Sequence, residues 1–264
     1  MNTSRWIKGR VAARRQWTGN LFSLMVEAGP IPFEAGQFIK IGLAGVDGIS
    51  LPAGDEGILG RPYSFVNPPQ DPLLEFLCVE VPGGPLSPRL ATLKPGEEIH
   101  VARQPAGFLV LSEIPDVDTL WMIGTGTGIG PFLSILRTEA PWRRFRQIAL
   151  VQGTRQLAER SHREVIDAIR LQHPQQFRMV SLVTRDALPS AGGGDALLQG
   201  RIPAAIADGR LEAAAAAQLA PDSSHVMLCG NPAMIAEVAD LLKARGMRRH
   251  RRRTPGHITV ENYW

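Results

Sequence analysis

The sequence predicts two domains of different class: an antiparallel β-barrel over residues 1–113 and a parallel α/β domain over residues 114–264. Short apolar stretches separated by Gly and Pro fill the first domain, which is typical of a small barrel. After a change of composition around 105–118, apolar stretches alternate with amphipathic ones. That alternation is typical of a parallel sheet with helices on its faces. A chain of 264 residues is long enough for both domains.

The strands of the first domain are predicted from alternating or continuous apolar residues at 21–26, 37–41, 74–81 and 98–102. A further strand begins at Arg61. The segment 86–93 is predicted to be a helix, with Ser87 as its N-cap. The Gly-rich segment 44–60 is expected to form a long hairpin loop.

In the second domain, strands are predicted at 119–123, 147–151, 178–183, 225–229 and 257–260. Helices are predicted at 131–139, 161–172 and 232–245. The alanine run 213–217 also favours a helix.

The first strand of this domain leads into a glycine-rich turn. Glycines occupy every second position from Gly124 to Gly130, and Pro131 suits the first turn of the helix that follows. Unpaired N–H groups at the positive end of a helix favour an anion such as a pyrophosphate. The spacing departs from G-x-G-x-x-G, because Ile129 stands at the third glycine, and it is not a P-loop. A tight turn without a ligand remains open.

Composition and charge narrow the function. The two cysteines, Cys78 and Cys229, are too few for an iron–sulfur cluster and indicate neither a disulfide framework nor a metal site. No apolar run is long enough to span a membrane, and the first residues are not a signal peptide. We therefore expect a cytoplasmic protein without membrane contact. The net charge of +4 favours acidic partners.

The segment Arg61-Pro62-Tyr63-Ser64 carries side chains suited to a flat, phosphorylated ligand. Alternation places Arg61 and Tyr63 on one face of the strand and Ser64 on the other. The guanidinium could pair with a phosphate, the phenol ring could stack, and the hydroxyl could donate to a ring nitrogen. An ordinary surface strand would also account for this segment.

Four segments in order give a resemblance: 61–64 (RPYS), 84–87 (GPLS), 124–131 (GTGTGIGP) and 229–232 (CGNP). Together they resemble the ferredoxin–NADP reductase family over essentially the whole chain, and the final ENYW resembles its bacterial ferredoxin/flavodoxin–NADP reductases. The resemblance implies a six-stranded FAD-binding barrel, an NADP-binding α/β domain, and electron transfer between NADPH and ferredoxin or flavodoxin.

The resemblance also implies which residues contact FAD. Arg61 would pair with the pyrophosphate, Tyr63 would pack on the isoalloxazine, and Ser64 would lie near flavin N5. The other residues that the resemblance implies are Pro62, Leu77, Cys78, Val79, Glu80, Pro85, Leu86, Ser87, Thr127, Tyr263 and Trp264. The last two would cover the flavin.

For the second nucleotide, arginines at strand ends favour NADP over NAD. Arg155 and Arg185 follow successive strands, Arg201 follows a Gly-rich turn, and all three match family positions. An acidic residue there would have indicated NAD. The resemblance adds Gly126, Gly128, Thr184, Cys229 and Asn231 to the NADP contacts. The family usually has a tyrosine where His162 aligns, so the residue that stacks on adenine stays open.

The expected catalytic residues are Ser64, Cys229 beside the nicotinamide, and Glu261 in proton handling. Cys229 could equally be a small buried apolar residue.

The arginine-rich segment 248–253 is the most basic part of the chain. We expect it to steer an acidic ferredoxin or flavodoxin toward the flavin, with the protein acting as a monomer and without nucleic acid. Two alternatives remain: a reductase component for an oxygenase or a ferric siderophore, and a nucleic-acid-binding module that uses this segment.

Overall fold

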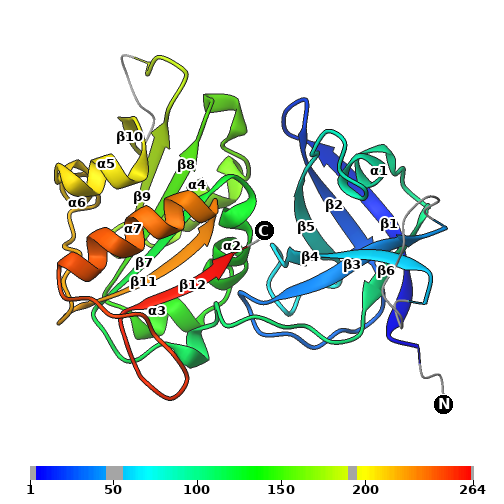
Figure 1. Ribbon diagram of the computed structural model, residues 1–264, viewed down its shortest axis with the longest axis horizontal. Helices are drawn as coiled ribbons and strands as arrows, with labels where there is room; N and C mark the ends of the chain where they lie inside the picture. Colours follow the sequence, from blue (N-terminus) through cyan, green and yellow to red (C-terminus); the bar gives the residue numbers. More distant parts are fainter. Residues whose placement is uncertain (1–3, 46–55, 190–194, 263–264) are drawn as a thin grey trace.

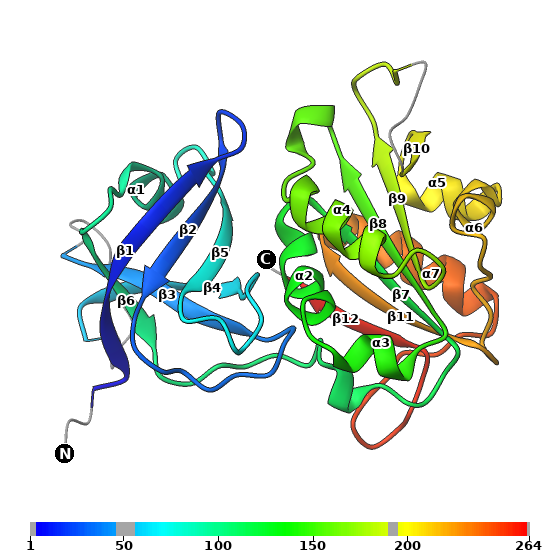
Figure 2. The ribbon, with the colours of Figure 1, turned by 180° about the vertical axis from the view of Figure 1, so that it is seen from behind.

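The computed structural model of the chain describes residues 4–45, 56–189 and 195–262. Two six-stranded sheets lie side by side, as Figure 1 and the reverse view in Figure 2 show. The N-terminal sheet is antiparallel and the C-terminal sheet is parallel with helices on both faces. The predicted fold class is therefore confirmed. Residues 46–55 of the expected hairpin loop lie outside the described residues.

The N-terminal sheet consists of β1 (Trp6–Gln16), β2 (Leu21–Glu27), β3 (Phe38–Ala44), β4 (Ile58–Ser64), β5 (Leu74–Val79) and β6 (Glu98–Ala102). The strand order is β4-β3-β6-β1-β2-β5. An antiparallel bridge between Phe65 and Phe76 joins the two ends of this order and closes the barrel. Closure removes the unpaired edges that would otherwise invite association. The short helix α1 (Ser87–Thr92) follows β5.

The C-terminal sheet consists of β7 (Thr119–Thr125), β8 (Gln147–Thr154), β9 (Phe177–Val183), β10 (Ala196–Gln199), β11 (Ser224–Gly230) and β12 (Ile258–Asn262). Its order is β10-β9-β8-β7-β11-β12, with parallel pairing throughout. The helices are α2 (Gly130–Leu136), α3 (Ala140–Arg144), α4 (Arg163–Gln172), α5 (Ile202–Ala207), α6 (Arg210–Ala215) and α7 (Pro232–Ala244).

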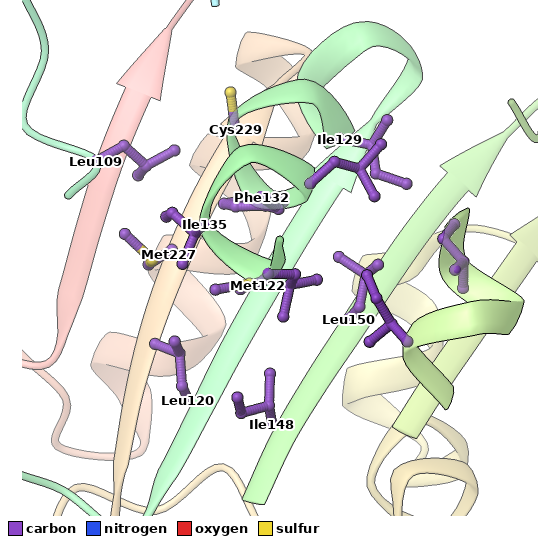
Figure 3. Packing of buried hydrophobic residues seen from close by; sticks show 14 of the residues in the cluster. Leu109, Leu120, Met122, Ile129, Phe132, Ile135, Ile148, Leu150, Met227 and Cys229 are labelled. Atoms are coloured by element: carbon purple, nitrogen blue, oxygen red, sulfur yellow. The ribbon is translucent and has the colours of Figure 1, made fainter. Parts of the chain in front are cut away.

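Two hydrophobic clusters cover the two faces of the parallel sheet. Along β7, Leu120 and Met122 join the cluster under α2 and α4, while Trp121 and Ile123 join the cluster under α5, α6 and α7. Figure 3 shows the first cluster around Phe132. Burial on both faces explains why β7 is continuously apolar in sequence.

Several local expectations differ from the structure. Ser87 is not the N-cap of α1, because the helix is capped at Leu86 and the Ser87 hydroxyl instead accepts a hydrogen bond from Val81 N–H at 2.9 Å. Strands β1 and β10 were not expected. β1 contains four exposed or half-exposed charged side chains, which hide its alternation: Lys8, Arg10, Arg14 and Arg15.

The two domains share one apolar seam. The cluster under α2 and α4 also contains Leu21, Val66 and Leu77, which come from the barrel domain. Burial of apolar surface between domains favours a fixed orientation over free hinge motion.

Polar contacts reinforce this seam at Glu75 of β5. One Glu75 oxygen lies 2.8 Å from Nε2 of His162, which precedes α4, and the other lies 3.5 Å from Arg137 at the end of α2. Arg137 also bonds Asp71 at 2.7 Å and the Val66 carbonyl at 3.3 Å. These partners hold the pKa of Glu75 below its usual value, against the effect of burial. The seam is thus specified by charge as well as by apolar burial.

Arg137→Ala should lower the free energy of unfolding by about 1–3 kcal/mol, because Glu75 loses a cationic partner in a half-buried seam. Denaturant unfolding measures this. Arg143→Ala is the matched control, since Arg143 pairs with Glu139 where both side chains are about four-fifths exposed. Its effect should stay within about 0.5 kcal/mol. Equal losses for the two variants would contradict a role of Arg137 in the seam.

Candidate active site at the seam between the domains

A cavity of ≈ 240 Å³ lies against the open end of the barrel. β4, β5, α1 and the turn before α2 supply its walls. The residues that line it are Arg61, Pro62, Tyr63, Ser64, Leu77, Val79, Val81, Gly84, Pro85, Leu86, Ser87, Thr127 and Gly130. Its walls are mainly apolar, with an arginine at one end and hydroxyl groups among the lining residues, a composition suited to a flat organic ligand.

Within this cavity β4 departs from the expected alternation. Arg61, Tyr63 and Ser64 all line the same cavity, because the strand ends at Ser64 and the cavity extends around its end. Burial raises the pKa of the Tyr63 phenol well above its ordinary value, so this ring remains neutral. A neutral, half-buried ring is a suitable stacking surface.

Glu261 of β12, in the second domain, lines neither cavity but contacts a residue in the wall of the first one. Its carboxyl is hydrogen-bonded to the Ser64 side chain. A Cβ placed on Gly107 would lie 2.8 Å from its Oε2, so the linker between β6 and β7 (residues 103–118) passes close to it. Its Oε1 has no hydrogen-bond partner among the described residues. Burial raises the pKa of Glu261 from 4.5 to about 8, so the carboxyl is protonated at neutral pH.

A second cavity, of ≈ 610 Å³, lies at the carboxyl ends of β7, β8, β9 and β11. Ligands of open α/β sheets bind at this edge. The predicted residues Val79, Glu80, Gly126, Thr127, Arg155, Thr184, Arg201 and Asn231 line it. Val79, Val81 and Thr127 line both cavities. The two spaces therefore adjoin at Thr127.

The glycine-rich turn between β7 and α2 is a 3-10 turn, Gly126–Ile129. Gly126 has a φ of +55° and lines the second cavity. A Cβ on Gly128 would lie 2.6 Å from the Cys229 carbonyl, so this glycine lets the turn pack against β11. Pro131 occupies the first turn of α2 as predicted. The structure accommodates the departure from G-x-G-x-x-G, because Ile129, at the position of the third glycine, is buried in the seam cluster.

Arg155 and Arg185 leave adjacent strands, as predicted, and Arg185 N–H donates to the Arg155 carbonyl at 2.8 Å. Only Arg155 of these two lines the second cavity. Arg201 lines it from the other side and pairs with Glu237 at 2.9 Å. Asn231 caps α7, its side chain accepting from Ala233 N–H and Met234 N–H.

Some predicted residues do not line either cavity. Cys78 is fully buried in the barrel core, since it alternates with Leu77 and Val79. Cys229 is fully buried in the seam cluster on the same sheet face as Met227 and Phe132 (Figure 3). Tyr263 and Trp264 lie outside the described residues.

His162 does not line the second cavity but lies buried in the seam against Glu75, with its ring 4.6 Å from that of Trp17. Its place is therefore the contact between the domains. This contact could not be predicted from the sequence, because Glu75 lies 87 positions away from His162.

Several lining residues were not predicted: Asn20, Leu21, Val81, Pro82, Gly84, Thr125, Gly130, Gly153, Thr154, Glu159, Gly200, Ile202, Pro203, Gly230, Ala233 and Met234. Most are small or apolar and carry no chemical signal in sequence. Glu159 is the exception, and its spacing of four from Arg155 was available as a signal.

None of the helices in residues 4–45, 56–189 and 195–262 is long and apolar enough to cross a membrane. The same residues contain no group of three or more His, Cys, Asp or Glu side chains placed to hold a metal ion.

Comparison with known proteins gives consistent matches. Residues 122–240 match the family model of the oxidoreductase NAD-binding domain. The chain is 45% identical to the flavodoxin/ferredoxin–NADP reductase of Escherichia coli (strain K12), over 98% of this chain and 99% of that one. It is 32% identical to the ferredoxin–NADP reductase of Azotobacter vinelandii, over 96% and 95% of the two chains.

Among solved structures, a ferredoxin NADP+ reductase from Neisseria gonorrhoeae with bound FAD and NADP superposes with a TM-score of 0.86. The two are 29% identical, and the match covers 99% of this chain and 100% of that one. With relatives this similar over nearly its whole length, the chain belongs to the flavodoxin/ferredoxin–NADP reductase family.

Proposed function

We propose that this chain transfers electrons between NADPH and flavodoxin or ferredoxin, with FAD in the cavity at the barrel and NADP(H) in the cavity at the sheet edge. One observation carries the proposal: Val79, Val81 and Thr127 line both cavities, so ligands in the two would meet. The Neisseria relative binds the same two cofactors.

The residues present fit a flavin. The apolar walls around Leu77 and Val79 and the neutral Tyr63 ring suit an isoalloxazine, and Arg61 suits a pyrophosphate. The buried Glu261 carboxyl has an oxygen without a partner among the described residues, which leaves it able to bond a ligand. When bound, FAD accepts two electrons together from NADPH and releases them singly to a one-electron carrier.

In this proposal the chain's own residues bind, orient and protonate. Arg61 would neutralise the pyrophosphate in the barrel cavity, assisted by Leu86 and Ser87 at the start of α1. Tyr63 fixes the plane of the ring system by stacking. Thr127 lies at the junction of the cavities, where the ring system and the nicotinamide would meet.

Glu261 and Ser64 form the proton-handling pair of the proposed site. The Glu261 carboxyl holds a proton up to about pH 8 and is hydrogen-bonded to Ser64 at the cavity wall. A group that donates at neutral pH, placed where charge changes, is suited to general acid catalysis. Cys229 is fully buried in the seam cluster, which fits a packing residue rather than a nucleophile.

For NADP selectivity, we assign Arg155, Arg201 and Thr184 to the 2′-phosphate. All three line the sheet-edge cavity, and guanidinium groups match phosphate oxygens in geometry and charge. Asn231 and Gly126 bound the same cavity nearer to the junction with the barrel. Residues 1–113 then form the FAD domain and residues 114–264 the NADP domain.

The arginine-rich segment is the proposed docking surface for the carrier. It follows α7 as a hairpin, with an antiparallel bridge between Arg251 and Thr254. Arg252 pairs with Glu113 at 3.1 Å and lies over the half-exposed Phe108 ring at 4.2 Å. Both belong to the linker, whose Leu109 and Leu111 are in the seam cluster, so this basic surface borders the seam between the domains. An acidic carrier would be steered there.

The proposed location is the cytoplasm, and the proposed state is a monomer. The chain has only two cysteines, and Cys78 is a buried free thiol, which fits a reducing compartment.

The visible spectrum of the purified protein tests the cofactors. It should show flavin absorbance that NADPH bleaches without oxygen at far lower concentration than NADH does, because the arginines at the sheet edge favour the 2′-phosphate. Flavodoxin or ferredoxin should then be reduced much faster than ferric chelates. A colourless protein, or one bleached equally by both nucleotides, would refute the assignment.

Protonation of Glu261 should make stability depend on pH. Between its unfolded pKa of 4.5 and its folded pKa of about 8, folding takes up a proton, so stability falls as pH rises through this window. Relative to Glu261→Gln, the wild type should lose roughly 1 kcal/mol per pH unit there, measured by denaturant unfolding. Glu139→Gln, an exposed control, should leave the slope unchanged. Parallel pH profiles for wild type and Glu261→Gln would show that the carboxyl is not buried in this way.

The docking surface is tested by Arg251→Gln combined with Arg253→Gln. Loss of two charges should raise KM for the acidic carrier about 3- to 10-fold at low salt and weaken the salt dependence, because steering is screened by ions. Reduction of a small neutral quinone should not change. Lys94→Gln with Arg10→Gln removes two exposed charges from the barrel as a control. If both double variants raise KM equally, only overall charge matters.

A further inference from the structure

A carboxylate lies directly beside the arginine proposed to bind the 2′-phosphate. Glu159 Oε1 accepts from Arg155 Nε at 3.0 Å and from Nη2 at 2.8 Å. Glu159 Oε2 accepts from the Arg155 backbone N–H at 2.8 Å. The residue therefore uses both oxygens on Arg155, one for its side chain and one for its main chain.

We infer that Glu159 is a positioning residue for NADP selectivity: it holds the Arg155 guanidinium in the orientation that receives the 2′-phosphate. The inference rests on the proposed function, in which Arg155 binds that phosphate. Glu159 acts through Arg155 rather than as a charge that attracts the ligand.

The turn that carries both residues is built to hold them. Residues Leu157–Glu159 form one 3-10 turn, and Glu159 also accepts from Gln156 N–H at 3.4 Å in a capping box. The side chain of Glu159 is only 14% exposed, whereas that of Arg155 is 53% exposed. The Glu159 carboxylate is thus mostly buried, while the Arg155 guanidinium remains accessible from the cavity that both residues line.

The neighbouring loop fixes the same turn from β9. Asp186 accepts from Leu157 N–H at 2.7 Å, and Thr184 N–H donates to the Thr154 carbonyl at 3.2 Å. With the bond from Arg185 N–H to the Arg155 carbonyl, the exits of β8 and β9 form one unit. The backbone around Arg155 is therefore set before any nucleotide arrives.

Two opposing effects decide whether Glu159 strengthens or weakens binding of the 2′-phosphate. Its negative charge repels a phosphate, but its bonds remove the rotamer freedom of Arg155, which binding would otherwise have to restrict. A guanidinium has five N–H donors in a planar fork, so it can serve two anions at once. Nη1 of Arg155 has no hydrogen-bond partner among the described residues, which leaves that edge for the ligand. We therefore expect positioning to outweigh repulsion.

Arg201 provides a contrast within the same cavity. Its partner Glu237 makes a single contact at 2.9 Å, and the two side chains are 61% and 45% exposed. A pair so exposed contributes little to stability and does little to hold the Arg201 guanidinium in one orientation. Glu237→Gln is therefore the matched control for Glu159→Gln.

The test measures binding directly, by calorimetry on the FAD-loaded protein with two probes, 2′,5′-ADP and 5′-ADP. The second lacks the 2′-phosphate. Glu159→Gln and Glu159→Ala should weaken 2′,5′-ADP binding by about 3- to 10-fold, with 5′-ADP changed less than about twofold, because only the phosphate contact loses its oriented partner. The NADPH/NADH ratio of kcat/KM should fall in step, through KM. Glu237→Gln should change neither probe measurably.

The outcomes separate this inference from the proposal beneath it. Tighter 2′,5′-ADP binding in Glu159→Gln would mean that repulsion dominates, and equal weakening of both probes would mean that the residue only supports the fold; either overturns the inference. If Arg155→Ala weakens 2′,5′-ADP but both Glu159 variants bind as wild type, the inference fails alone. If Arg155→Ala itself has no effect, the proposed phosphate site is wrong. Flavin content and melting temperature verify folding, and Glu159→Gln carries the test if Glu159→Ala does not fold.

Discussion

The contact of Glu75 with His162 and Arg137 of the other domain is the constraint on which the active site depends. His162, which precedes α4, lies 2.8 Å from one Glu75 oxygen, and Arg137, which follows α2, lies 3.5 Å from the other. Beneath them, Leu21, Val66 and Leu77 of the barrel enter the core of the parallel sheet. The charged contact specifies how the two domains align, because a carboxylate without its partners in a half-buried seam would be costly. Apolar burial then stabilises the aligned domains.

Once the seam fixes the orientation of the two domains, few further contacts are needed to form the site. The glycine-rich turn packs on β11 through Gly128 and presents Thr127 to both cavities. β12, beside β11, carries Glu261 across to Ser64 of the barrel. Each domain thus contributes groups to the other's cavity. This arrangement explains a carboxyl that stays protonated at neutral pH in an enzyme whose chemistry couples protons to electrons.

The elements and residues that depend on local sequence patterns could be predicted. The apolar run before Gly124 identified β7, and the arginines at strand exits identified the sheet edge that Arg155 occupies. It failed where the structure depends on distant residues. His162 contacts Glu75 across the seam, and Ser87 bonds Val81 instead of capping its helix. Cys78 was placed in the cavity with its neighbours, although period-2 alternation turns it into the barrel core.

The most direct test of the account is the rate of flavin reduction by NADPH in Thr127→Trp, measured by rapid mixing without oxygen. Thr127 lies where the cavities adjoin, so an indole there should separate the two ligands without removing either binding site. We predict that the variant retains FAD and 2′,5′-ADP binding while reduction slows on the order of 100-fold, the cost of a misplaced reacting pair. An unchanged rate of reduction would contradict the claim that hydride passes through this junction.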